Sequence, residues 1–302
     1  MRQLLPVGYS PNNITVNWTI TYGCNYDCSY CPSHAKDWKD FSYENTVEAF
    51  LFLYEEVIKR YNKKTLLWFT GGEPTELEWF LEFLAYVNSV DSNITIGVTT
   101  NGSRTLEYYK NMHALIDRAT YSLHFDWANY KSFMKKTYEL HKLYKNRVHI
   151  AVMYEKPHSD LAEKTCQFFS KSGIQYQLLS VRNIKDSTDD YYRYTNSQVA
   201  YIRDNTSVLN DILIDEVPTS SQKILNEQDL DKVGFKDWTC WAGVDYLYIT
   251  QNYDVISSWC RIREQGNLLE KRLHYDNQPV LCDGRLCACN TDVMTRKEFY
   301  DV

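Results

Sequence analysis

Short runs of apolar residues alternate, up to residue 181, with longer segments in which apolar residues recur three and four positions apart. The short runs predict β-strands, and the longer segments predict amphipathic helices with one buried face. The predicted strands are residues 14–21, 65–70, 94–99, 119–125, 148–154 and 174–181. The predicted helices are residues 42–61, a segment from residue 75, and residues 103–117, 126–145 and 160–172.

Six strand–helix units in series predict a parallel sheet with helices outside it, because each crossover is right-handed and returns to the same sheet. The predicted fold class is therefore α/β, as a partial (β/α)6 TIM-like barrel. Thr75 and Glu78 predict a capping box for the second helix, and Gly173 a stop for the last one. Cys166 lies in the middle of a predicted helix, where we expect an ordinary core thiol.

The pattern changes after the barrel. Residues 186–237 are polar, with short amphipathic pieces, and predict a connector or lid. Residues 246–250 and 255–259 then predict a hairpin, with Cys240 before it and Cys260 after it. Three more cysteines follow in a loop, namely Cys282, Cys287 and Cys289. Five cysteines around one hairpin and one loop indicate a second metal site.

Three other cysteines stand close together directly after the first predicted strand. Cys24, Cys28 and Cys31 have the spacing C-x3-C-x2-C. Three thiolates on one short loop can hold three irons of a 4Fe-4S cluster and leave the fourth iron open for a small molecule. The alternative is a zinc site or a set of core cysteines, with His34 as a possible fourth zinc ligand.

Four further stretches lie at the carboxyl ends of predicted strands, where parallel barrels bind ligands. They are 71–74, 100–102, 122–124 and 181–182. Gly71 and Gly72 remove side chains where the backbone passes close to a ligand, and their carbonyls with Glu73 are suited to a cationic amino group. Thr100 and Asn101 offer polar groups suited to a ribose or a carboxylate. Tight turns are the structural alternative for both stretches.

Composition and charge narrow the function classes. The chain has 302 residues, a hydrophobic fraction of 44% and a net charge of −6, which gives no general attraction for nucleic acid. No segment predicts a membrane span or a signal peptide, so we expect a soluble, cytoplasmic protein. In such a chain, clustered cysteines are more often metal ligands than disulfides.

The order of motifs resembles the radical S-adenosylmethionine (radical SAM) enzymes, in the broad group that includes the molybdenum-cofactor, pyrroloquinoline-quinone and peptide-modifying members. The cysteine loop after the first strand, Gly-Gly-Glu-Pro after the second and Thr-Asn-Gly after the third carry this resemblance, which covers residues 14–182. It implies that the three cysteines bind a 4Fe-4S cluster and that the open iron takes the amino and carboxylate groups of S-adenosylmethionine. Reductive cleavage would then give methionine and a 5'-deoxyadenosyl radical, with a flavodoxin or a ferredoxin-type protein as the electron donor.

The resemblance also implies roles for particular residues. The stretch that meets the methionine amino group corresponds to Gly71, Gly72 and Glu73, and the position beside adenine to Tyr30. The positions that contact ribose or carboxylate correspond to Thr100, Asn101 and Ser122.

The C-terminal segment is similar to the twitch or SPASM extensions of this group, which hold auxiliary iron–sulfur clusters. Five cysteines are too few for two such clusters, so the resemblance implies one auxiliary 4Fe-4S cluster among Cys240, Cys260, Cys282, Cys287 and Cys289. Either three or four of them are ligands; a spare one would be a structural thiol or a hydrogen donor, and a structural zinc is the alternative. The predicted domains are a barrel at 1–185, a connector or lid at 186–237 and an auxiliary-cluster domain at 238–302.

Three functions follow from these observations. The first is oxidation or rearrangement of a small molecule, and the second is modification of a ribosomally made peptide. About thirteen residues precede the first strand, so we expect no leader-peptide domain. The third is a non-catalytic iron–sulfur redox protein. Candidates for contact with the substrate, all after predicted strands, are His124, Asp126, Tyr154, Glu155 and Arg182.

Overall fold

The computed structural model describes residues 2–6, 10–31, 42–181, 194–205, 212–214, 235–258, 260–283 and 295–300. The chain forms two compact units. The first comprises Met1–Thr19, Phe41–Trp68 and Val208–Val302, and the second comprises Ile20–Asp40 and Phe69–Ser207. The division falls within strands β2 (Asn13–Thr21) and β3 (Lys64–Gly71), so both strands contribute residues to both units.

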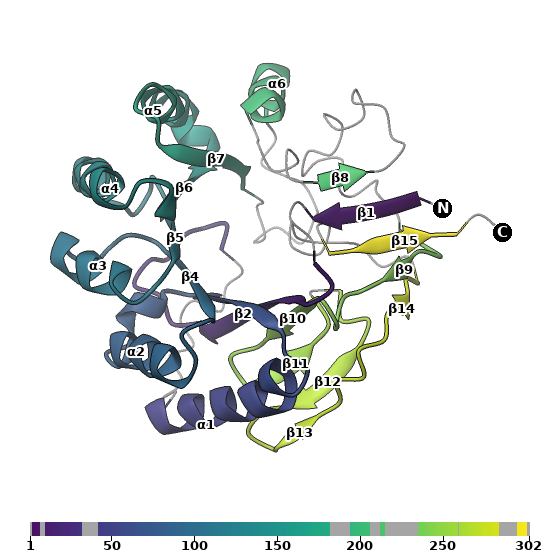
Figure 1. The fold of residues 1–302 in the computed structure, drawn as a ribbon. Helices are drawn as coiled ribbons and strands as arrows, with labels where there is room; N and C mark the ends of the chain where they lie inside the picture. Colours follow the sequence, from purple (N-terminus) through teal and green to yellow (C-terminus); the bar gives the residue numbers. More distant parts are fainter. Residues whose placement is uncertain are drawn as a thin grey trace. The chain divides into compact units, whose positions relative to one another are not determined.

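The second unit contains most of an α/β partial barrel. Its strands are β4 (Thr95–Thr100), β5 (Arg118–Leu123), β6 (Val148–Tyr154) and β7 (Gln175–Ser180). Its α-helices are α2 (Phe80–Val90), α3 (Leu106–His113), α4 (Tyr130–Tyr144), α5 (Ser159–Lys171) and α6 (Asn196–Asn205). Helices α3 to α5 lie on the outside of these strands (Figure 1). Short 3-10 helices cover Pro74–Glu76, Lys145–Arg147 and Lys156–His158.

Strands β4 to β7 pair in parallel, in chain order. The register aligns Thr100 with Tyr121, Leu123 with Val152, and Tyr154 with Ser180. The carboxyl ends of the strands therefore meet at one edge of the sheet. Together with β2 and β3, which precede β4 in the strand order, they complete the predicted six parallel strands.

The first unit contains helix α1 (Tyr43–Leu53), which continues as a π-helix over Tyr54–Lys59. Its hairpin of β10 (Tyr246–Ile249) and β11 (Asp254–Ile256) is antiparallel, as predicted. Strand β10 also pairs in parallel with β2, and β11 continues into β12 (Glu264–Asn267) and β13 (Arg272–Leu273). The hairpin thus extends the large sheet, a pairing that the hydrophobic pattern alone does not predict.

A second, antiparallel sheet of the first unit joins both ends of the chain. Its order is β14 (Val280–Leu281), β9 (Thr239–Cys240), β15 (Lys297–Phe299), β1 (Arg2–Pro6) and β8 (Ile212–Ile214). Strands of two to five residues carry too little alternation to be recognised from sequence. In the part of the chain that the structure describes, no helix is long and apolar enough to cross a membrane.

The six barrel strands and the helices between them are confirmed, with shifts at the helix starts. The predicted capping box is wrong: Thr75 lies in a 3-10 helix, and α2 begins only at Phe80. The Thr75 hydroxyl instead donates to the Glu73 carboxylate. Helix α4 begins at Tyr130, because the Asn129 side chain accepts from the Ser132 N–H.

Two smaller predictions are also confirmed. Gly173 ends the last barrel helix with a φ of +67°, and Cys166 is fully buried. The predicted domain boundary after residue 185 lies outside the described residues, and the three-domain division stays a prediction.

Candidate functional site

The cysteine loop of the second unit follows β2 and packs on the ends of other barrel strands. Cys28 and Tyr30 are buried in one apolar cluster with Val181, and Met153 of β6 packs against it. The Cys31 N–H donates to the Cys28 carbonyl at 3.1 Å, which closes a turn between the two cysteines. Both thiols therefore lie at the edge of the sheet where ligands of parallel barrels bind.

The three thiols are close enough to influence one another. Burial raises the pKa of Cys24 to about 11 and that of Cys28 to about 12, and the charge of Cys31 raises both pKa values further. A metal or cluster removes this penalty, because its positive charge stabilises the thiolates. Three converging thiols without a fourth cysteine on the loop fit a cluster that leaves one iron without a protein ligand.

Gly72 brings the end of β3 against the backbone of the cysteine loop. A Cβ atom at this position would lie 2.1 Å from the Gly23 carbonyl oxygen. The Gly72 N–H donates to the Thr21 carbonyl and the Glu73 N–H to the Gly23 carbonyl, both at 2.7 Å. This glycine is therefore required for close backbone packing, whereas Gly71 has a φ of +130° that favours glycine.

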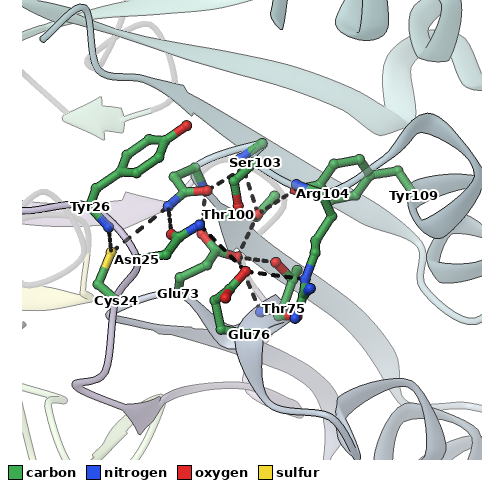
Figure 2. A network of polar contacts seen from close by, with 12 residues as sticks. Cys24, Asn25, Tyr26, Glu73, Thr75, Glu76, Thr100, Ser103, Arg104 and Tyr109 are labelled. Atoms are coloured by element: carbon green, nitrogen blue, oxygen red, sulfur yellow. Dashed lines mark hydrogen bonds and ion pairs between the residues drawn. The ribbon is translucent and has the colours of Figure 1, made fainter. Parts of the chain in front are cut away.

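Glu73 lies at the centre of the polar network in Figure 2, and its side chain is fully buried. Its Oε1 accepts from the Thr75 N–H at 3.1 Å, the Thr75 hydroxyl at 2.6 Å and the Thr100 hydroxyl at 2.7 Å. Its Oε2 accepts from the Asn101 N–H at 2.5 Å. Burial raises the pKa of Glu73, and these bonds oppose that effect. The carboxylate thus joins the ends of β3 and β4.

Tyr30 connects the cysteine loop to the ends of β5 and β6. Its hydroxyl donates to Glu155 Oε1 at 2.8 Å and lies 2.7 Å from His124 Nδ1, and its ring stacks on the His124 ring. A hydroxyl has one hydrogen, so His124 Nδ1 must be the donor to Tyr30. Burial lowers the pKa of His124 to about 4, which is consistent with a neutral imidazole protonated at Nδ1.

The other predicted contact residues lie near this network. Glu155 Oε1 also accepts from the Phe125 N–H at 2.7 Å, and Asp126 Oδ1 lies 2.7 Å from His158 Nε2. Asp126, Glu155 and His158 have ligand atoms within 4.8 Å of one another, but the contacts above already explain this arrangement. The remaining candidates are Ser122, which is buried on β5, Tyr154, whose hydroxyl donates to Glu163, and Arg182, which lies outside the described residues.

Three of the later cysteines are described in the first unit. Burial raises the pKa of Cys240, and the charges of Cys260 and Cys282 raise it further. The pairing of Val280 with Cys240 brings the strand before Cys282 beside β9. The Cys282 N–H donates to the Trp238 carbonyl at 2.8 Å, next to β9. Cys287 and Cys289 lie outside the described residues.

Sequence reasoning missed two residues beside these sites. Asn25, inside the cysteine loop, accepts a hydrogen bond from Asn101 at 2.7 Å. Lys297 is fully buried and pairs with Cys240 between β15 and β9, and its charge lowers the pKa of Cys240. The position of a polar residue between predicted metal-ligand cysteines was a usable signal for Asn25, whereas a lysine in a three-residue strand gave none.

The sequence comparisons find similarity over the barrel segment. Residues 18–153 match the model of a family described as the Radical SAM superfamily. A 7-carboxy-7-deazaguanine synthase from Clostridium acetobutylicum is 35% identical over 89 residues, which cover 30% of this chain and 38% of that protein. The chain thus spans well under half the length of this curated relative.

Solved structures share the fold at low identity. BtrN in complex with AdoMet and 2-DOIA aligns with a TM-score of 0.50 and 14% identity, over 86% of this chain and 80% of BtrN. Streptococcus suis SuiB bound to S-adenosylmethionine aligns with a TM-score of 0.56 and 14% identity, over 85% of this chain and 64% of SuiB. The anSMEcpe structure with bound AdoMet and the Cp18Cys peptide aligns with a TM-score of 0.57 and 15% identity, over 85% of this chain and 78% of anSMEcpe. Residues 18–153 of this chain are therefore similar in sequence to the radical SAM superfamily, and the solved structures share its fold.

Proposed function

We propose that the chain reductively cleaves S-adenosylmethionine and uses the resulting radical to remove a hydrogen atom from a small-molecule substrate. The observation that carries this proposal is the convergence of three motifs within the second unit. Glu73 hydrogen-bonds to the backbone of the cysteine loop and, through its side chain, to Thr100 and Asn101. The cysteine loop and two polar strand ends are thus held at one edge of a parallel sheet, which supports a cluster site there.

In this proposal each residue has a limited task. Cys24, Cys28 and Cys31 would hold a 4Fe-4S cluster, and the strand ends at Gly71–Glu73, Thr100 and Ser122 would surround S-adenosylmethionine. When bound, these groups supply a one-electron cleavage that yields methionine and a 5'-deoxyadenosyl radical. Tyr30 would lie beside the adenine, with its hydroxyl held by His124 and Glu155. Packing of Cys28 and Tyr30 against Val181 would keep water away from that side.

The C-terminal cysteines support a second cluster in the same proposal. Cys260 and Cys282 are close enough to Cys240 for their charges to raise its pKa, and Cys287 and Cys289 follow in the chain. A second 4Fe-4S cluster would accept an electron from the substrate radical, which leaves the oxidised product, or would bind the substrate. A flavodoxin or ferredoxin-type protein would reduce the first cluster. Structural zinc is the competing occupant.

Modification of a ribosomally made peptide is the second candidate function. SuiB also has a solved structure with the precursor peptide SuiA, which aligns with a TM-score of 0.58 over 88% of this chain. BtrN, in contrast, is described in complex with 2-DOIA, and this chain covers a larger share of BtrN than of SuiB. These neighbours motivate both candidates, and we place the small-molecule substrate first.

Anaerobic reconstitution with iron and sulfide, followed by S-adenosylmethionine and dithionite, tests the proposal. We expect 5'-deoxyadenosine from the wild type and none after Cys24→Ala, Cys28→Ala or Cys31→Ala. Cys166→Ala is the matched control, because Cys166 is a buried thiol in helix α5. A wild type that holds iron but forms no 5'-deoxyadenosine would favour the non-catalytic redox protein instead. Counts of about eight irons per chain indicate two clusters, and about four indicate one.

A further inference from the structure

The sulfur of Cys24 lies near two N–H donors in the structure. The Tyr26 backbone N–H donates to this sulfur at 3.4 Å (Figure 2). Asn101 Nδ2 lies 3.8 Å from the same sulfur. The first donor belongs to the cysteine loop itself, whereas the second comes from the end of β4. Asn101 is buried, so water competes little for its amide.

A backbone donor determines which way the Asn101 amide points. The Ser103 backbone N–H, which can only donate, lies 3.0 Å from Asn101 Oδ1. The oxygen must therefore face Ser103, and the NH2 group must face Cys24 and Asn25. The Asn25 amide is oriented in the same way from its other side, because its Nδ2 donates to the Glu76 carboxylate at 3.4 Å.

The chain of amides therefore has a single direction. Ser103 donates to Asn101, Asn101 donates to Asn25 Oδ1 at 2.7 Å and to Cys24, and Asn25 donates to Glu76. Arg104 Nε holds Glu76 in place at 3.1 Å. Both amide hydrogens and the oxygen of Asn101 are thus engaged inside the protein.

The backbone of Asn101 is anchored as firmly as its side chain. Its N–H donates to the buried Glu73 carboxylate, which also accepts from the Thr100 hydroxyl. This anchoring leaves the amide little freedom to turn toward a ligand. An N–H group directed at a cluster cysteine stabilises the more negative, reduced form of an iron–sulfur cluster and so raises its reduction potential.

We propose that Asn101 is a positioning residue that raises the reduction potential of the first cluster through its amide contact with Cys24, and not a residue that binds S-adenosylmethionine directly. The inference rests on the proposed function, since it requires a cluster on Cys24. It assigns Asn101 a different task from the ribose or carboxylate contact that the family resemblance implies.

The test measures the potential and the ligand affinity separately. Reconstituted wild type, Asn101→Ala and Asn101→Asp are titrated with dithionite and followed by electron paramagnetic resonance, using the signal that added S-adenosylmethionine perturbs. Without the ligand, we expect Asn101→Ala to lower the equilibrium constant for one-electron reduction of the cluster about tenfold. This corresponds to a reduction potential lower by about 59 mV. Asn101→Asp keeps an acceptor for Ser103 but places a carboxylate near the sulfur, so its shift should be larger. Asn111→Ala, on the exposed side of α3, is the matched control.

Equilibrium dialysis with S-adenosylmethionine provides the second measurement. An unchanged dissociation constant together with a lowered potential supports the inference. An unchanged potential together with a dissociation constant at least tenfold weaker overturns it and restores the direct contact. If the Asn101 variants lose iron, Asn25→Ala decides, because it removes the acceptor that, together with the Ser103 N–H, holds the Asn101 amide beside Cys24. It should lower the potential in the same direction, and no shift there overturns the inference. A wild type without iron refutes the proposed function itself.

Discussion

Replacement of Gly72 by alanine is expected to separate the cysteine loop from the end of β3. The added Cβ would lie 2.1 Å from the Gly23 oxygen and 2.6 Å from both the Gly23 carbon and the Tyr22 oxygen. A carbon and an oxygen in contact normally lie about 3.3 Å or more apart. All three obstructing atoms belong to the backbone, so no side-chain rotation relieves the clash, and the two segments must move apart by about 1 Å.

That movement also affects two hydrogen bonds. The Gly72 N–H to Thr21 and Glu73 N–H to Gly23 bonds, both 2.7 Å long, would lengthen beyond bonding distance. Overpacking costs about 1–3 kcal/mol, and each lost bond costs about 0.5–1.5 kcal/mol. The free energy of unfolding should therefore fall by about 2–6 kcal/mol, a large share of the stability of a typical domain.

Urea denaturation and the iron content after reconstitution are the two assays. We expect Gly72→Ala to have a lower urea midpoint and to bind less iron at the first site, because the loop carries the three cysteines. Gly173→Ala is the control: no atom lies within 4 Å of its added Cβ, so it carries only the cost of a left-handed φ, about 1–2 kcal/mol. Wild-type stability and iron content in Gly72→Ala would refute the close-approach argument.

Three further predictions concern other residues. Burial lowers the pKa of the His113 imidazole to about 4. Between about pH 6.5 and 4 the unfolded chain therefore binds a proton at His113 that the folded protein does not bind. The free energy of unfolding falls as the pH drops through this range. His113→Phe should reduce that slope by up to about 1.4 kcal/mol per pH unit in urea titrations; an unchanged slope would contradict the burial effect. Tyr30→Phe removes a donor to the buried Glu155 and should cost about 1–3 kcal/mol in urea unfolding, whereas Glu155→Gln keeps the acceptor and should cost less. Cys240→Ala should lower the iron count from about eight to about four per chain, and an unchanged count would exclude Cys240 as a ligand.

The barrel was predictable because its information is local. Strands such as Val148–Tyr154 are short apolar runs, the helices between them have an apolar stripe, and both periodicities are visible in the sequence. The predicted capping box failed because the hydroxyl of Thr75 had a stronger competing partner in Glu73. A capping motif describes a few residues, and it cannot anticipate a buried carboxylate that also binds Thr100 on another strand.

By itself, the sequence determined the cysteine spacing, the glycine pair after the second barrel strand and the order of strands and helices. These features depend on near neighbours in the chain. Tertiary structure decided that Gly72 packs against Gly23, that Glu73 turns inward, and that the Asn101 amide points at Cys24. The direction of a side chain at a strand end depends on donors and acceptors from other strands, which come together only when the sheet forms.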